Sequence, residues 1–141
     1  MSELASVGPM TCSDPIGEPG ADGAIGYENM WMMANSQEFD GVSPAMWETF
    51  LLDYQKPIFE RFGLVGYGCC ENLTQKIDGV LSLSNLRIFV CSAWTDLQAV
   101  QEAVGQDYVI MWRQKAVPRV AAACGLSGRR GDHPTRLGGG L

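Results

Sequence analysis

The chain contains 141 residues with a formal net charge of −6; 46% of the residues are hydrophobic and 18% are charged. This length and composition predict one globular domain, and the negative charge argues against nucleic acid as a partner. Because the sequence has no apolar run of about 18 residues and no secretory signal at its start, we expect a cytoplasmic protein without a membrane span.

Composition divides the chain into three parts. Residues 1–28 are rich in glycine, proline and aspartate, which predicts an irregular N-terminal arm. Residues 117–141 are rich in glycine and arginine and predict an irregular tail. The tail also contains His133, the only histidine. The folded α/β part is therefore expected over residues 29–116.

A long helix is predicted after Ser43. The Ser43 side chain can cap free N–H groups, and Pro44 suits the first helical position. Pro57 is expected to kink the helix, and Gly63 is expected to end it. Apolar residues recur at steps of three or four and predict one buried face: Trp47, Phe50, Leu51, Tyr54, Ile58 and Phe62.

Three short apolar segments farther along predict buried strands, over residues 64–70, 86–91 and 108–112. Helical patterns separate them, over residues 73–81 and, after a Thr95-Asp96 cap, over residues 97–104. Alternating strands and helices are typical of parallel βαβ units, so the fold class is α/β. Three strands form a small sheet, and a parallel sheet needs cover on both faces. We therefore expect a partner chain or a piece of a larger α/β fold.

Candidate functional residues follow each predicted strand, where parallel α/β folds place their reactive groups. The segment Tyr67-Gly68-Cys69-Cys70-Glu71 combines a phenol, two thiols and a carboxylate. Trp94 follows the second strand, and Arg113 and Lys115 follow the third. Arg113 suits a carboxylate or phosphate because its guanidinium donates two parallel hydrogen bonds, and the alternative is a solvated surface role.

Cysteine usage leaves two interpretations of the thiols. The odd number and irregular spacing argue against a disulfide framework. Cys69 and Cys70 could bind zinc or act as nucleophiles once they are deprotonated. The residues alone favour the alternative that they are inert core residues, as free cysteines often are. The five cysteines are Cys12, Cys69, Cys70, Cys91 and Cys124.

Residues 29–116 resemble uroporphyrinogen decarboxylase-domain proteins, and more narrowly the bacterial branch related to corrinoid-dependent methyltransferases. The resemblance rests on SQEFDGVSPAMWETFLLDYQKPIFERFGLVGYGCCENL, then NLRIFVCSAWTDL and DYVIMWRQKA. It implies a partial (β/α)8 TIM-type barrel, with about three βα units in this chain. True decarboxylases of this family remove carboxyl groups from a tetrapyrrole without a cofactor. The methyltransferase relatives use zinc to activate a thiol that accepts a methyl group from a corrinoid.

The resemblance also implies roles for individual residues. Cys69 matches the cysteine of the zinc-binding His-x-Cys pair, and Tyr67 stands where those enzymes have histidine. The first hypothesis is thus a methyltransferase-like enzyme, with Cys69, Tyr67 and Glu71 catalytic. In this hypothesis Arg113 and Trp94 bind substrate, and Cys69 and Cys70 bind zinc. The expected partner is a small-molecule tetrapyrrole or a methyl-corrinoid protein.

Three alternatives stay open. The chain could act in uroporphyrinogen decarboxylation, in which case no cofactor is expected. It could also be a non-catalytic truncated remnant or an interaction subunit that needs a complementing chain or a homo-oligomer. A small flavodoxin-like binding domain is the weakest alternative, because the sequence has no recognisable phosphate loop.

Overall fold

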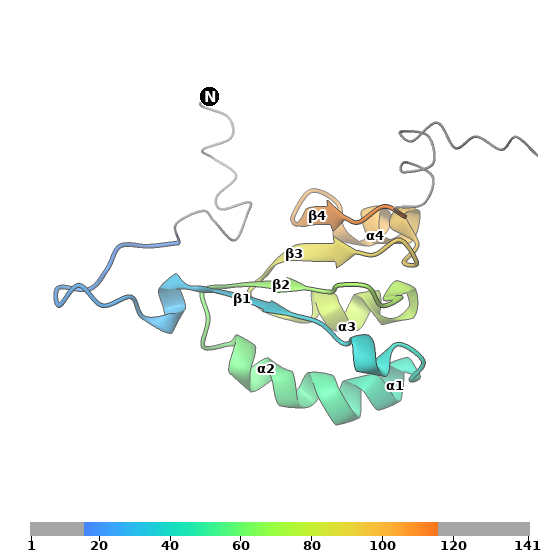
Figure 1. Ribbon diagram of the computed structural model, residues 1–141, viewed down its shortest axis with the longest axis horizontal. Coiled ribbons are helices and arrows are strands. Elements are labelled where there is room, and N and C mark those ends of the chain that lie inside the picture. Colours follow the sequence, from blue (N-terminus) through green and yellow to red (C-terminus); the bar gives the residue numbers. More distant parts are fainter. Residues whose placement is uncertain (1–15, 116–141) are drawn as a thin grey trace, which may run out of the picture.

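A parallel sheet of four strands forms the centre of the computed structural model, which describes residues 16–115 (Figure 1). The strand order across the sheet is the same as the order along the chain. Each adjacent pair is parallel, so the fold class is α/β as predicted. The strands are β1 (Trp31–Ala34), β2 (Leu64–Tyr67), β3 (Leu86–Cys91) and β4 (Val109–Trp112).

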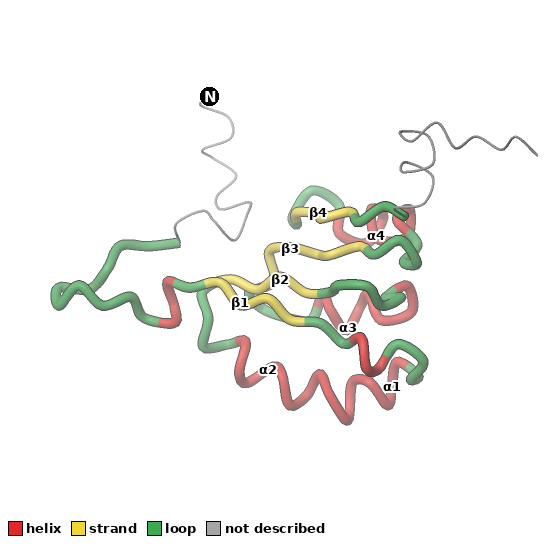
Figure 2. Tube along the Cα trace, viewed as in Figure 1, coloured by secondary structure: helices red, strands yellow, loops and turns green. Residues whose placement is uncertain are grey.

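Helices connect consecutive strands and pack on one face of the sheet (Figures 1 and 2). Residues from every connection join strand residues such as Tyr67 and Phe89 in one buried cluster. That common core places the helices on the same side. The helices are α1 (Pro44–Trp47), a π-helical turn (Glu48–Leu52), α2 (Asp53–Phe59), α3 (Ile77–Leu81) and α4 (Leu97–Val104), with 3-10 turns at Tyr27–Asn29, Gln37–Phe39 and Thr74–Lys76.

The prediction of three strands was wrong by one, because β1 precedes the first helical connection and adds a fourth strand at the edge of the sheet. β1 contains only four residues, and its partner strand β2 lies beyond the whole first helical connection. The register pairs Met32 with Val65 and Ala34 with Tyr67. Long-range pairing therefore stabilises a segment whose local pattern is weak.

The predicted buried face of the long helix was confirmed at Trp47, but it was wrong farther along the helix. Leu52 and Phe59 are the next buried residues, whereas Tyr54 is 71% exposed and Phe50 is 60% exposed. The π-helical turn after Trp47 widens the helix, so the next buried residue comes five positions later instead of three or four. The chain also continues across Pro57 without ending the helix.

Both predicted helix caps were confirmed. The Ser43 side chain accepts a hydrogen bond from the Met46 N–H, and Asp96 accepts hydrogen bonds from Gln98 N and Ala99 N at the start of α4. Gly105 ends α4 with a positive φ of 54°, a conformation that glycine adopts without a Cβ clash. These caps fix where the loops at the ends of the strands begin.

Some predictions concern residues outside the described range. The predicted tail at 117–141, including His133 and Cys124, lies outside it, and so does Cys12 in the arm. Residues 16–26 of the arm contain no helix or strand, and a 3-10 turn begins at Tyr27. None of the helices between residues 16 and 115 has the length and apolar character that crossing a membrane requires.

Candidate functional site

Two adjacent thiols and a guanidinium meet at the carboxyl end of the sheet. Gly68 follows β2 with a φ of 112°, which turns the chain out of the strand so that Cys69 is half-buried and Cys70 is exposed. The two sulfur atoms lie 3.7 Å apart. Arg113, which follows β4, donates a hydrogen bond from Nη1 to the Cys69 sulfur at 3.1 Å. We call these three residues the thiol–guanidinium cluster.

Burial raises the pKa of the Cys69 thiol above its ordinary value. The hydrogen bond and the charge of Cys70 raise this pKa further, whereas the charge of Arg113 and its hydrogen bond lower it. The net direction is upward, so Cys69 is a protonated thiol at neutral pH. A protonated thiol is a weak nucleophile and a poor metal ligand, but it can donate a proton.

The pH dependence of Cys69 alkylation tests this electrostatic balance. We expect the rate of reaction with iodoacetamide to rise at a higher pH than for an unperturbed thiol, because only the thiolate reacts. Removing the positive charge in Arg113→Gln should move the midpoint of the profile still higher. Fragment-ion mass spectrometry after limited labelling distinguishes the label on Cys69 from the label on Cys70. An unchanged midpoint in the variant would contradict the role of Arg113.

An aromatic ring and a second cation lie beside the cluster. Trp94, in the loop after β3, is 63% exposed. The Lys115 ammonium lies 4.3 Å from the centre of the Trp94 ring, a cation–π contact. Together with Arg113, Lys115 gives this end of β4 a local positive charge. The sequence placed all of these residues at strand ends, and the structure brings them to the same edge.

Tyr67 lies apart from the thiols, in the core between the sheet and the helices. Its side chain is fully buried and makes edge contacts with the rings of Trp47 and Phe59. The hydroxyl donates a hydrogen bond to Gln55 Oε1 at 3.0 Å. Burial raises the pKa of Tyr67, so the phenol stays protonated. The predicted catalytic role is untested, and the contacts are those of a core residue.

Glu71 is buried and joins two loops instead of facing the thiols. Its Oε1 atom accepts hydrogen bonds from Ser36 N at 2.6 Å and Ser36 Oγ at 3.2 Å, and Oε2 accepts one from Cys69 N at 2.9 Å. Its backbone carbonyl accepts hydrogen bonds from the hydroxyls of Ser92 and Thr95. Sequence reasoning missed Ser36 and Ser92, whose only signal was a position just after a strand, and it assigned Thr95 only to the cap of the following helix.

The donor set around Cys69 does not fit zinc among the described residues. Zinc needs three or four protein ligands, and residues 16–115 contain no group of three candidate ligands. The Glu71 carboxylate is occupied by backbone and hydroxyl donors, and Cys91 is buried with its sulfur near the Ser92 and Thr95 carbonyls. The Arg113 cation also occupies the space next to the Cys69 sulfur.

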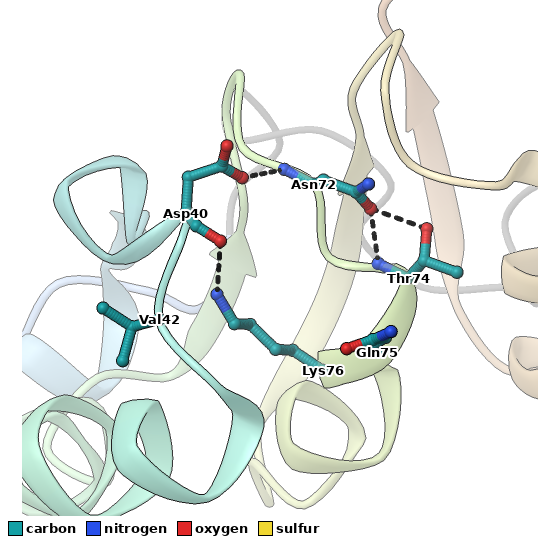
Figure 3. A pocket seen from close by; sticks show the side chains of 6 residues that line it. All are labelled: Asp40, Val42, Asn72, Thr74, Gln75 and Lys76. Atoms are coloured by element: carbon teal, nitrogen blue, oxygen red, sulfur yellow. Dashed lines mark hydrogen bonds between the residues drawn. The ribbon is translucent and has the colours of Figure 1, made fainter.

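A polar pocket of about 380 Å³ lies on the outer side of the same sheet end (Figure 3). The Asp40 carboxylate closes one wall by accepting a hydrogen bond from Asn72 N at 2.6 Å. Buried Lys76 donates from Nζ to the carbonyls of Phe39 and Asp40, and burial lowers its pKa. Because these polar groups already bond to the protein, the pocket is a weaker candidate than the thiol–guanidinium cluster.

No family model, curated protein or solved structure matches the chain. The resemblance to uroporphyrinogen decarboxylase-domain proteins therefore remains a prediction that rests on the sequence segments quoted above. A functional conclusion therefore depends on the chemistry of the thiol–guanidinium cluster. Its distinguishing contact is the one between the Cys69 thiol and the Arg113 guanidinium.

Proposed function

We propose that this chain supplies half of a (β/α)8 barrel in an enzyme of the uroporphyrinogen decarboxylase superfamily. In such a barrel, parallel strands follow one another in chain order with their helices outside. The strand order β1-β2-β3-β4 and the helices packed on a single face support this proposal. The carboxyl ends of barrel strands carry the active site, and the thiol–guanidinium cluster lies at these ends.

The contact between Cys69 and Arg113 carries the functional proposal. Arg113 continues the alternation of Val109 and Met111, which places it on the face opposite the helices, toward the interior of a barrel. A guanidinium there can bind a carboxylate with two parallel hydrogen bonds. Trp94 and Lys115 flank this position. The substrate that fits is a small molecule bearing carboxylates, such as a tetrapyrrole.

A decarboxylation without a cofactor suits the protonated state of Cys69. Loss of carbon dioxide leaves an electron pair on the substrate carbon, and that carbon must take up a proton. The Cys69 thiol can donate it, and the thiolate that forms lies against the Arg113 guanidinium at 3.1 Å. In this proposal Tyr67 and Glu71 are positioning residues, because their side chains bond within the protein.

Methyl transfer to a thiol is the second candidate function. The observation that favours it is the pair of neighbouring sulfur atoms, 3.7 Å apart at an exposed edge. The methyl group would pass from a corrinoid to a thiolate of Cys69 or Cys70, with the electron pair of the cobalt–carbon bond remaining on cobalt. Arg113 would stabilise the thiolate charge before the transfer.

Binding of uroporphyrin by the full chain, followed by tryptophan fluorescence, tests the proposal. We expect Arg113→Gln to weaken binding about tenfold or more, as loss of a charged hydrogen-bonding partner does. Arg61→Gln is the matched control, because Arg61 is exposed and stacks on Tyr27 before β2. Equal affinity of the Arg113 variant and the unmodified chain would overturn the proposal.

The reaction itself separates the two candidates. With uroporphyrinogen as substrate, Cys69→Ser should retain binding but lose most of the release of carbon dioxide. With methylcobalamin, a gain of one methyl group on Cys69 or Cys70 in the mass spectrum would favour methyl transfer instead. Turnover of uroporphyrinogen that is unaffected by Cys69→Ser would remove Cys69 from the mechanism.

A further inference from the structure

The adjacent cysteines after β2 have the arrangement of a pair that an oxidant can convert into a disulfide. Their sulfur atoms lie 3.7 Å apart, and both thiols are free. Cys70 is exposed, whereas Cys69 is half-buried and accepts a hydrogen bond from Arg113 Nη1 at 3.1 Å. Cysteines that respond to oxidants are accessible and often lie next to a second cysteine that resolves the first product. Here one sulfur is accessible, and the other lies beside it.

Hydrogen bonds hold the backbone on both sides of the pair. The Glu71 carboxylate accepts a hydrogen bond from Cys69 N at 2.9 Å, and the Asp40 carboxylate accepts one from Asn72 N at 2.6 Å. Groups that are already held close together react without the entropic cost of first finding each other. The loop therefore favours a reaction between its own two thiols over a reaction with a distant one.

We propose that Cys69 and Cys70 form a reversible disulfide when a hydroperoxide reaches the exposed sulfur. The modification is separate from the reaction proposed above and goes beyond it. The hydroperoxide is the oxidant, and the two thiols are the reductant. The contacts that support the proposal are the short distance between the sulfur atoms, the exposure of Cys70 and the anchored loop.

Two steps convert the thiols into the disulfide. The thiolate of Cys70 attacks the terminal oxygen of the hydroperoxide, the O–O bond breaks, and the other oxygen leaves and takes up a proton. The Cys70 sulfur is then a sulfenic acid. The Cys69 sulfur attacks it, the S–O bond breaks, and the oxygen leaves as water with the Cys69 proton. The two thiols lose two electrons, and the hydroperoxide gains them.

The disulfide between neighbouring residues should be easy to reduce. Consecutive Cα atoms are about 3.8 Å apart, and disulfides usually join Cα atoms at least about 4.4 Å apart. The shorter span strains the bond and makes it more reducible. In the oxidised chain Cys69 has no proton to donate, so the proposed decarboxylation should stop until a thiol reduces the bond. This last consequence alone rests on the proposed function.

Mass spectrometry of one tryptic peptide of the full chain tests the proposal. Cleavage after Arg61 and Lys76 gives the peptide 62–76, which contains Cys69 and Cys70 and no other cysteine. After treatment with hydrogen peroxide and then with iodoacetamide in denaturant, this peptide should have two fewer hydrogen atoms and no label. Dithiothreitol added before the iodoacetamide should restore two labelled thiols.

Serine variants establish which thiols take part. Cys69→Ser and Cys70→Ser should each abolish the loss of two hydrogen atoms, and Cys69→Ser should leave Cys70 with added oxygen. Cys91→Ser is the matched control, because the Cys91 sulfur is buried near the carbonyls of Ser92 and Thr95. This control should form the disulfide as the unmodified chain does. Circular dichroism checks the fold of each variant.

Arg113 should assist the second step. Its guanidinium stabilises the negative charge that the Cys69 sulfur carries as it attacks. Dimedone traps sulfenic acids and so competes with ring closure. We expect Arg113→Gln to raise the ratio of dimedone-labelled Cys70 to disulfide about threefold or more, as loss of a charged hydrogen-bonding partner does. An unchanged ratio would remove Arg113 from this step.

Two outcomes would overturn the proposal. One is a peptide 62–76 that still takes a label on Cys69 after the peroxide treatment, whether Cys70 is unchanged or carries added oxygen. The other is a disulfide from Cys69 or Cys70 to a different cysteine, which appears as a cross-linked pair of peptides. Either result would leave the test of uroporphyrin binding unaffected, because that test uses the reduced chain.

Discussion

Replacing Tyr67 with alanine is expected to lower the free energy of unfolding by about 3–5 kcal/mol, the range for removing a large buried ring. The side chain is fully buried, and its ring centre lies 6.2 Å from that of Trp47 and 6.1 Å from that of Phe59. Alanine leaves a cavity where three elements of the core meet. Urea denaturation followed by circular dichroism measures the change.

Tyr67→Phe separates the ring from the hydroxyl. This variant keeps the packing and loses the hydrogen bond to Gln55, so we expect a loss of only about 1 kcal/mol. The raised pKa of Tyr67 means that the unfolded chain releases the phenolic proton first as pH increases. Stability should therefore fall as pH rises above 10.0, the unperturbed value, and Tyr67→Phe should remove that component. If Tyr67→Phe instead abolished turnover at unchanged stability, the phenol would be catalytic.

Glu71→Ala is expected to have the second large effect, about 3 kcal/mol or more of lost stability. The carboxylate accepts hydrogen bonds from Ser36 N, Ser36 Oγ and Cys69 N. Alanine leaves these donors without an acceptor in a buried position. Glu71→Gln should lower the free energy of unfolding by about 1–3 kcal/mol. The amide oxygen of glutamine can still accept the hydrogen bonds from Ser36, but its NH2 group would face the Cys69 N–H, which is also a donor.

Glu102→Gln is the matched control for Glu71. Glu102 is exposed on α4 and accepts a hydrogen bond from Gln98, so the expected change is within about 0.5 kcal/mol. Because Glu71 also holds the backbone of Cys69, its variants should alter the alkylation rate of that thiol. Unchanged stability in Glu71→Ala would show that the loops after β1 and β2 hold their positions without the carboxylate.

The buried strands and the caps were predictable from the sequence, but two long-range features were not. Leu86–Cys91 is a mainly apolar segment with polar residues before it, which is a local signal for a buried strand. Ser43 and Asp96 are local signals for the starts of helices. The four residues of β1 have no comparable local signal. The phase of the first helix depends on Trp47, whose ring lies against Gly79 of α3, where any side chain would collide with it. Periodicity within one helix cannot reveal that contact.

The candidate site was predictable in part for a similar reason. The rule that reactive groups gather where parallel strands end placed Cys69 and Arg113 at one edge, and the structure brings them into contact. The same rule did not distinguish these residues from Tyr67 and Glu71, whose side chains turn into the protein. The difference depends on the backbone at Gly68, with its φ of 112°. A sequence pattern does not specify that dihedral angle.

The agreement between chain order and strand order also shapes how the protein folds. Gly66 pairs with Ile88, and Ile88 pairs with Val109, so each strand meets the next after a single helical connection. The entropic cost of closing a loop grows only slowly with its length, so closing one helical connection costs less than joining strands that lie farther apart in the chain. Each new strand can thus pair with the strand that precedes it in the chain. The sheet can begin to assemble on the ribosome, before β4 has been synthesised.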